Sequence, residues 1–294
     1  MAPRVHLSER VPAEIERELA ADFELIASPV GADGVVAMLT VTVDDAYLEA
    51  AGPQLRIVAN YAVGVNNVDL EAARRRGIVV SNTPDVLTGA TAELALTLML
   101  SLLRRVTEGD RFVRRREAWR FSLEFMLGER LEGKTVLIVG AGRIGRETAR
   151  LAEAFGARTV LAGRDADLDG LLGEADVVSL HVPLTDDTRH LIDARRLALM
   201  KPSAVLINTA RGPVVDEAAL AAALRSGTIA GAGLDVYERE PEVTESLLDL
   251  ENVVLAPHLG SATRDTRIAM GMLCVTALRS VLLEGRVPRN AVVR

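Results

Sequence analysis

Apolar residues occur along this chain in two patterns: short unbroken runs, and residues spaced three or four positions apart. Segments with the first pattern alternate with segments with the second. Short aliphatic and β-branched runs are typical of strands buried on both faces of a parallel sheet. Such runs predict strands at residues 5–7, 23–27, 35–39, 55–59, 78–81, 136–139, 159–162, 177–180, 205–208, 231–236 and 253–256. Apolar residues three or four positions apart predict helices at residues 12–21, 44–51, 70–76, 88–105, 107–119, 146–155, 193–200, 217–226 and 263–284. Strands that alternate with helices predict an α/β protein.

Two segments depart from this alternation. Residues 28–34 form the whole link between the predicted strands 23–27 and 35–39. A parallel crossover usually needs a dozen or more residues, so these strands are not expected to be ordinary βαβ neighbours. Residues 121–133 are irregular and carry several large apolar side chains, which suits either a dimer arm or a loop packed on its own domain.

The most specific motif is Gly140-Ala141-Gly142-Arg143-Ile144-Gly145, which lies between a predicted strand and a predicted helix. In that setting G-x-G-x-x-G indicates a dinucleotide-binding turn. Gly140 permits the tight turn, Gly142 lets the backbone approach a pyrophosphate, and Gly145 lets the helix pack closely on the strand. The free N–H groups and the positive helix end favour an anion. The alternative is a glycine-rich turn with no ligand.

The sequence predicts two α/β domains. The helical and strand patterns break at Asn82-Thr83-Pro84-Asp85, a candidate hinge. We expect residues 1–87 to form a smaller, flavodoxin-like substrate-binding lid, and residues 88–267 a doubly wound, parallel-sheet Rossmann nucleotide domain inserted in it. Residues 268–294 are expected to be a helix that returns to the lid. The substrate would lie in a cleft that closes around it.

Composition and charge exclude several classes of protein. The 294 residues suffice for one or two domains, and a formal net charge of −7 argues against a general nucleic-acid binder. One cysteine, Cys274, allows no intrachain disulfide, and no spacing resembles a metal site. No signal-peptide core is found, and the apolar stretch Leu94 to Leu103 is too short to span a bilayer. We therefore expect a cytoplasmic protein with no membrane partner.

Three polar residues follow predicted strands, at the edge where ligands bind in open α/β sheets. They are Arg211, Glu240 and His258. Arginine can grip a carboxylate and polarise a carbonyl, and histidine can supply a proton near neutral pH. Glutamate beside the histidine would favour the imidazolium form. Together they suggest a carbonyl-reducing site.

Each of these residues also has a purely structural alternative. Arg211 could cap a helix or bind only a cofactor phosphate. Glu240 could be a solvated loop acid in Tyr-Glu-Arg-Glu-Pro, and His258 could be a strand-end histidine hydrogen-bonded to the backbone.

The residues after the predicted strand 159–162 bear on cofactor choice. An NAD-specific protein usually places an acid there to bind the ribose 2′-hydroxyl. Here Gly163 stands at that position and Arg164 follows. Arginine can pair with a 2′-phosphate, so the sequence predicts that NADP(H) is preferred and NAD(H) is still usable. The alternative is that Arg164 is a solvated surface residue and Asp165 takes the role of the acid.

The motifs also carry a family resemblance that covers most of the chain. The matching stretches are Asn60 to Val65, Ser81 to Thr88, Gly140 to Gly145, His181 to Thr185, Ile207 to Gly212, Gly233 to Tyr237 with Glu240-Pro241, and Pro257 to Gly260. In these the chain resembles the D-isomer-specific 2-hydroxyacid dehydrogenases, most of all glyoxylate/hydroxypyruvate reductases. Two features differ: the first domain is shorter, and the region after Trp119 lacks the usual proline-containing pattern.

The resemblance implies roles for the candidate residues. Arg211 would bind and polarise the substrate, His258 would donate the proton, and Glu240 would hold and charge His258. Backbone N–H groups near Val63 and Gly64 would receive the substrate carboxylate.

Leu87 would border the same pocket, so the expected substrate-binding residues are Val63, Gly64, Leu87, Arg211 and His258. The expected cofactor-binding residues are Gly140, Gly142, Arg143, Ile144, Gly145, Gly163, Arg164, His181, Pro183, Thr188, Thr209, Ala210, Asp235, His258 and Gly260. The expected partners are a small 2-keto or 2-hydroxy acid and a second copy of the chain in a homodimer.

Other functions remain open at this point. One alternative is another dehydrogenase of the same family, acting on 3-phosphoglycerate or phosphite. A formate dehydrogenase is disfavoured because that family member carries Gln where this chain has Glu240. The other alternative is a dinucleotide-sensing regulatory protein of the same fold, which would bind the cofactor and oxidise it very slowly.

Overall fold

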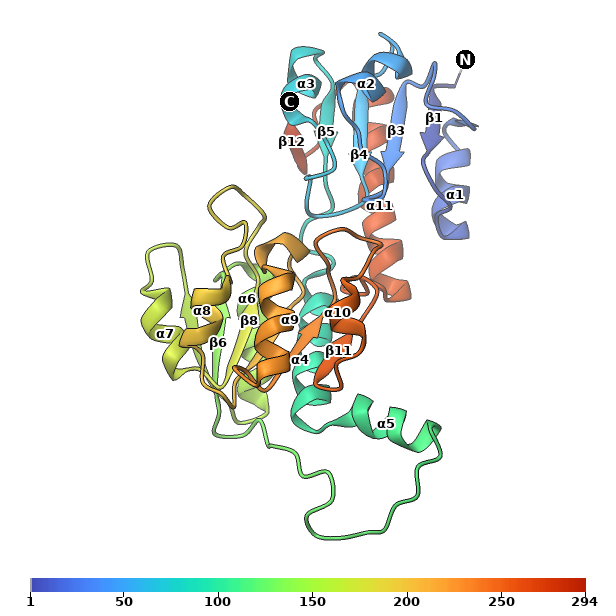
Figure 1. Ribbon diagram of the computed structural model, residues 1–294. Helices are drawn as coiled ribbons and strands as arrows, with labels where there is room; N and C mark the ends of the chain where they lie inside the picture. Colours follow the sequence, from blue (N-terminus) through green and yellow to red (C-terminus); the bar gives the residue numbers. More distant parts are fainter. Residues whose placement is uncertain (1) are drawn as a thin grey trace. The chain divides into compact units, whose positions relative to one another are not determined.

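The computed structural model describes residues 2–294, which form two compact units (Figure 1). The first contains the chain up to Leu87 together with Ala262–Arg294, and the second is Thr88–Ser261. Each unit is built on a mainly parallel six-stranded sheet with helices on its faces, which confirms the predicted α/β fold class. No helix within residues 2–294 is both long and apolar enough to cross a membrane.

The first sheet has the strand order β12-β5-β4-β3-β1-β2. Its strands are β1 (Arg4–Leu7), β2 (Glu24–Ile26), β3 (Gly34–Ala37), β4 (Ile57–Asn60), β5 (Val79–Ser81) and β12 (Ala291–Val293). The first five are parallel and have the flavodoxin-like order 2-1-3-4-5. The C-terminal β12, which the sequence pattern did not predict, joins β5 in the antiparallel direction.

The short link after β2 has a simple explanation in this order. β2 and β3 pair with opposite sides of β1, so they are not neighbours, and no helix lies between them in the chain. The helices of this unit are α1 (Ala13–Ala20), α2 (Asp45–Ala51), α3 (Leu70–Arg75) and α11 (Arg264–Leu282). Helix α11 contacts β3, β4 and β5 and packs against α1. A Cβ on Gly34 would lie 2.6 Å from Leu278 of α11, so glycine lets this helix approach the sheet.

The domain boundary at the C-terminal side lies earlier than expected. We expected the nucleotide domain to continue to Arg267, but the second unit ends at Ser261. The reason is that α11 begins at Arg264 and is tied to the first unit from its first turn. The guanidinium of Arg264 pairs with Glu14 at 2.6 Å, and the Tyr61 hydroxyl donates to the Arg267 carbonyl.

The second sheet is parallel throughout, with the order β11-β10-β9-β8-β6-β7. Its strands are β6 (Thr135–Val139), β7 (Arg158–Ala162), β8 (Val177–Leu180), β9 (Val205–Asn208), β10 (Gly231–Leu234) and β11 (Val253–Leu255). Its helices are α4 (Thr88–Leu103), α5 (Val106–Arg114), α6 (Arg143–Ala154), α7 (Leu168–Glu174), α8 (Ala194–Leu199), α9 (Glu217–Ser226) and α10 (Glu245–Leu248).

This sheet has a hydrophobic core on each face, as expected for a doubly wound domain. Val136 and Ile138 of β6 enter one core with α4 and α6. Leu137 and Val139 enter the other, on the side of α7, α8 and α9. Successive strand residues point to opposite faces, which explains why β6 is an unbroken apolar run. Helices α7 and α10 were not predicted.

Two predicted helices of this unit differ in length. Helix α6 begins at Arg143, before the predicted start at residue 146, because the glycine turn itself forms its first turn. Helix α5 ends at Arg114, before the predicted end at residue 119. None of the residues of α5 is buried, so its amphipathic pattern has no packed face to prolong it.

Candidate active site

Three loops that follow neighbouring strands carry the candidate catalytic residues. Arg211 follows β9, Glu240 lies beyond β10, and His258 follows β11. These strands are adjacent and parallel in the order β11-β10-β9. Their carboxyl ends therefore meet at one edge of the sheet, as the sequence pattern predicted.

Glu240 and His258 form a direct pair. Oε2 of Glu240 lies 2.6 Å from Nδ1 of His258, and its Oε1 accepts the Tyr237 N–H at 3.1 Å. Burial raises the pKa of Glu240. The hydrogen bond to His258 and its charge, the hydrogen bond from the Tyr237 amide and the charge of Arg211 oppose this effect, and the pKa of Glu240 is below its usual value. The Glu240 carboxylate holds His258 through Nδ1 and leaves Nε2 for a ligand.

The loop that carries His258 is held by Asp235. The buried Asp235 carboxylate accepts the N–H groups of Leu259 at 2.6 Å and Gly260 at 2.8 Å. Its backbone carbonyl accepts the His258 N–H at 2.9 Å. His258 has a φ of +55°, in the left-handed region that costs energy for a residue with a Cβ. Asp235 thus fixes the conformation that presents the imidazole, and its expected contact with the cofactor stays a prediction.

The loop that carries Arg211 is braced by Asn208. The Asn208 side chain donates to the Arg211 carbonyl at 2.9 Å and accepts the Ala210 N–H at 3.0 Å. A Cβ on Gly212 would lie 1.8 Å from the Tyr237 carbonyl carbon, so only glycine allows this loop to approach the loop that carries Glu240. Burial lowers the pKa of Arg211, and the Glu240 charge opposes that shift.

A second histidine lies at the same edge of the sheet, after β8. His181 contacts the Ser179 hydroxyl through Nε2 at 2.9 Å, and burial lowers its pKa to about 4. A neutral imidazole is a poor proton donor near pH 7. Of these two histidines, His258 is therefore the one suited to general acid catalysis.

Burial of His181 predicts a loss of stability in acid. Its pKa is 6.5 when exposed and about 4 when folded, so the unfolded chain binds the extra proton between those values. Stability is full above pH 6.5 and falls as the pH drops through that window. At ~1.4 kcal/mol per pH unit, the loss at pH 5 is about 2 kcal/mol.

Urea unfolding of the native protein and of His181→Gln at pH 7.5 and pH 5 measures this loss. We expect the native protein to lose about 2 kcal/mol more than the variant over this range. Equal losses in the two proteins would contradict the assignment of a buried, neutral His181.

The glycine turn has the geometry that a dinucleotide needs. Gly140 has a φ of +105°, and a Cβ there would lie 2.7 Å from the His181 carbonyl. A Cβ on Gly145 would lie 2.2 Å from the Gly140 carbonyl oxygen, so this glycine lets α6 pack on β6. A Cβ on Gly142 would meet nothing within 4 Å. No protein contact therefore requires glycine at 142, which fits a backbone left bare for an approaching phosphate.

The remaining expected cofactor residues lie around this edge. Thr209 has a buried hydroxyl with no hydrogen-bond partner in the described chain, a feature that a bound ligand would explain. The Thr188 hydroxyl donates to the Pro183 carbonyl at 2.6 Å and accepts the Thr185 N–H at 2.8 Å. These hydrogen bonds stabilise the turn formed by residues 183–188. Within residues 2–294, no cluster of His, Cys, Asp and Glu side chains could hold a metal ion.

Comparison with known proteins assigns the family. A family model described as "D-isomer specific 2-hydroxyacid dehydrogenase, NAD binding domain" matches residues 96–260. A glyoxylate reductase of Thermococcus litoralis is 44% identical, with 99% of this chain and 97% of the relative covered. The chain belongs to the D-isomer-specific 2-hydroxyacid dehydrogenase family.

Two solved structures show the same architecture over nearly the whole of this dehydrogenase. One is a putative D-isomer-specific 2-hydroxyacid dehydrogenase from Polaromonas, with a TM-score of 0.93, 33% identity, and coverage of 99% of this chain and 100% of that one. The other is an NADPH-dependent glyoxylate/hydroxypyruvate reductase from Sinorhizobium meliloti in complex with NADP and malonate. It has a TM-score of 0.86 and 36% identity, with coverage of 99% of this chain and 97% of that one.

Three of the expected substrate residues of the dehydrogenase, Val63, Gly64 and Leu87, belong to the first unit. Val63 and Gly64 lie in the loop that follows β4, and Leu87 is buried just before α4. This loop is at the carboxyl end of its own parallel sheet, where ligands bind in this class of fold.

One supporting residue was missed by the sequence analysis. Glu217, the first residue of α9, is buried and accepts the Glu238 N–H and the Thr244 hydroxyl. It therefore anchors both ends of the segment that carries Glu240. An acid in the first turn of a helix is common for reasons of capping alone, so nothing in the sequence marked it.

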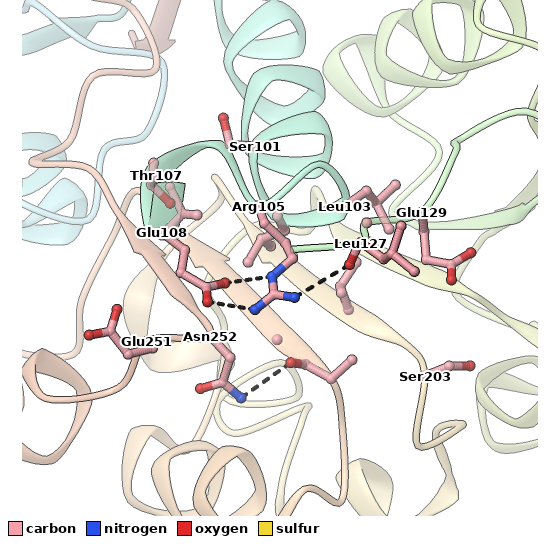
Figure 2. A pocket seen from close by; sticks show the side chains of 16 residues that line it. Ser101, Leu103, Arg105, Thr107, Glu108, Leu127, Glu129, Ser203, Glu251 and Asn252 are labelled. Atoms are coloured by element: carbon pink, nitrogen blue, oxygen red, sulfur yellow. Dashed lines mark hydrogen bonds and ion pairs between the residues drawn. The ribbon is translucent and has the colours of Figure 1, made fainter. Parts of the chain in front are cut away.

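A separate hollow of about 280 Å³ lies at the opposite end of the second sheet. Val205 and Gly231, the first residues of β9 and β10, line it, so it is remote from the carboxyl edge. Figure 2 shows that the Arg105 guanidinium is bound by Glu108 on one side and by the Leu127 carbonyl on the other. Because its central charge is already paired, this hollow is a poor candidate for the active site.

Proposed function

We propose that this enzyme uses NAD(P)H to reduce a small 2-keto acid, glyoxylate or hydroxypyruvate, to the D-2-hydroxy acid. The observation that carries the proposal is the 2.6 Å Glu240–His258 pair, with Arg211 close enough for its charge to act on Glu240. Glyoxylate reductases from Thermococcus litoralis and Aeropyrum pernix, at 44% and 46% identity, support the choice of substrate.

Each residue then has a defined task. The bound nicotinamide dinucleotide supplies the hydride. Nε2 of His258 donates a proton to the carbonyl oxygen, while Glu240 stabilises the imidazolium before transfer. Arg211 stabilises the negative charge that grows on that oxygen. The loop at Val63 and Gly64 receives the substrate carboxylate through backbone N–H groups, and Leu87 borders the substrate.

A panel of 2-keto acids assayed with NADPH and NADH tests this function. Glyoxylate and hydroxypyruvate are expected to give the highest kcat/KM. A clear preference for a phosphorylated hydroxy acid or for phosphite would indicate the other family activities. Tight binding of a dinucleotide with negligible turnover of every 2-keto acid would indicate a sensor.

NADPH is the proposed preferred cofactor. β7 ends at Ala162, so Gly163 and Arg164 stand where an NAD-specific enzyme usually has its acid. Both residues are exposed, and Arg164 forms no hydrogen bond or ion pair with residues 2–294. A charge-assisted hydrogen bond from Arg164 to a 2′-phosphate contributes about 1.5 to 3 kcal/mol, or roughly ten- to a hundred-fold in preference.

Two variants measure this preference. Arg164→Ala is expected to lower kcat/KM for NADPH roughly ten- to a hundred-fold and to leave NADH nearly unchanged. Gly163→Asp is expected to reverse the order, and a Cβ at 163 meets nothing within 4 Å, so the new side chain has room. A native enzyme with higher kcat/KM for NADH than for NADPH would show that Asp165, not Arg164, governs the choice.

We also propose a homodimer formed through residues 119–128. The C-terminal end of this segment is tied to its own unit, since the Arg105 guanidinium donates to the Leu127 carbonyl and the N–H of Glu129, just beyond the segment, donates to the Leu103 carbonyl. Earlier in the segment, Phe121 and Leu123 are 82% and 86% exposed. Large exposed apolar side chains on an anchored segment fit an arm that packs on a second copy better than a loop packed on its own domain.

A further inference from the structure

Three asparagine side chains surround the loop that follows β4. Nδ2 of Asn82 donates to the Val63 carbonyl at 2.8 Å, and Nδ2 of Asn60 donates to the Gly64 carbonyl at 2.8 Å. Nδ2 of Asn67 donates to Oδ1 of Asn60 at 3.0 Å. Two successive carbonyl oxygens of one exposed loop are therefore each bound by a side-chain amide.

The amides that make these bonds are themselves fixed. Asn60 is fully buried, and its oxygen is occupied by Asn67, so its nitrogen must face Gly64. Asn82 is held through its backbone, because its N–H donates to the Asn290 carbonyl and its carbonyl accepts the Asn290 side chain. The C-terminal segment thus supports the position of Asn82.

The direction of these carbonyls sets the direction of the neighbouring N–H groups. Both peptides are trans, and in a trans peptide the N–H points away from the carbonyl oxygen. The N–H groups of Gly64 and Val65 therefore point away from the asparagines. Neither donates a hydrogen bond to another group within residues 2–294, so both are available to an anion.

We propose that Asn60 and Asn82 are positioning residues that orient these two peptides, so that the N–H groups of Gly64 and Val65 receive the substrate carboxylate. The inference rests on the proposed function and adds the reason that the loop selects an acid. With the asparagines in place, the loop presents donors to the ligand and keeps its carbonyl oxygens turned away. Without them, either peptide can rotate and present an oxygen that repels a carboxylate.

The test compares glyoxylate with glyoxylamide, which has the same aldehyde and a neutral amide in place of the carboxylate. In Asn82→Leu we expect KM for glyoxylate to rise about ten-fold, the lower end of the effect of one hydrogen bond to a charged group. The kcat and the KM for NADPH should change little. The ratio of kcat/KM for glyoxylate to that for glyoxylamide should fall about ten-fold, and further in Asn60→Leu/Asn82→Leu.

Gln54→Leu is the matched control. Gln54 lies at the opposite end of β4, and its amide also donates to two backbone carbonyls of the same unit, those of Ala32 and Ala51 at 3.1 and 2.6 Å. Its loss should leave the glyoxylate-to-glyoxylamide ratio unchanged. If Asn82→Leu does not fold, Asn82→Asp keeps the size of the side chain, removes the donor, and should also lower the ratio.

Two results would overturn the inference. One is an unchanged ratio in both Asn82 variants, and the other is an equal fall in Gln54→Leu, which would show a general loss of structure. A native enzyme that reduces no 2-keto acid would instead overturn the proposed function, and the inference with it.

Discussion

His258→Ala is expected to lower kcat for glyoxylate reduction by about 10²- to 10⁴-fold, the usual contribution of a positioned general acid. The structure gives a reason to expect the full effect. Glu240 occupies Nδ1 of His258, and His181, which follows β8 at the same edge, is kept neutral by burial. His181 is therefore not expected to replace the lost donor. Steady-state rates at saturating NADPH measure the loss.

Two companion variants show whether the loss comes from proton transfer. Glu240→Gln keeps the shape of the side chain but removes its charge, so the pH at which reductive activity falls away should move lower. Because the pKa of Glu240 lies below its usual value, the native carboxylate is ionised across the neutral range and its own titration does not mask this change. His6→Gln, in the first unit, should leave the rate unchanged. An unchanged kcat in His258→Ala would remove His258 from the mechanism.

The sequence contained enough information to place the candidate catalytic residues at one edge. Arg211, Glu240 and His258 each follow a short apolar run, and such runs form parallel strands in this fold. Once β9, β10 and β11 are neighbours, their carboxyl ends meet without any further information. The bounds of β8, β9 and α9 also agree with the sequence pattern, because turn-forming or capping residues limit these segments.

The contacts that fix the geometry could not be read in this way. The need for glycine at 212 arises from the backbone of Tyr237, and the roles of Glu217 and Asp235 arise from N–H groups in other loops. Each depends on which loops meet in space. The spacing of apolar residues indicates which side of a segment is buried, but not which distant group that segment will contact.

The same limit explains the errors in local structure. β12 has three residues, and it exists because β5 offers an edge more than two hundred positions earlier in the chain. Helix α5 was predicted too long because the sequence continues a helical pattern beyond Arg114. No residue of this helix is buried, so tertiary packing does not extend it. In both places tertiary contacts, not local preference, decide where the element begins or ends.

Arg211→Ala is expected to lower kcat by about 10²- to 10³-fold, the usual cost of removing one group that stabilises an oxyanion. Unlike the loss of His258, it should also raise KM for glyoxylate, because a guanidinium that grips the substrate acts in the ground state as well as in the transition state. A kinetic comparison at fixed NADPH therefore separates the two residues. The two effects belong to one side chain, so they should appear together.

Arg211→Lys is the informative companion, because it keeps the charge and loses the planar fork. If the positive charge alone were needed, lysine would restore most of kcat. The Arg211 loop is shaped by Asn208 and by the contact at Gly212, and the Nη1 atom of Arg211 is held by the Ala210 carbonyl at 2.6 Å. This fixed orientation suits the planar guanidinium and its rigid set of N–H donors. We therefore expect Arg211→Lys to recover less than a tenth of the native kcat. Arg225→Ala, at an exposed arginine of the same unit, controls for the loss of one charge. A native KM in Arg211→Ala would show that Arg211 does not bind the substrate.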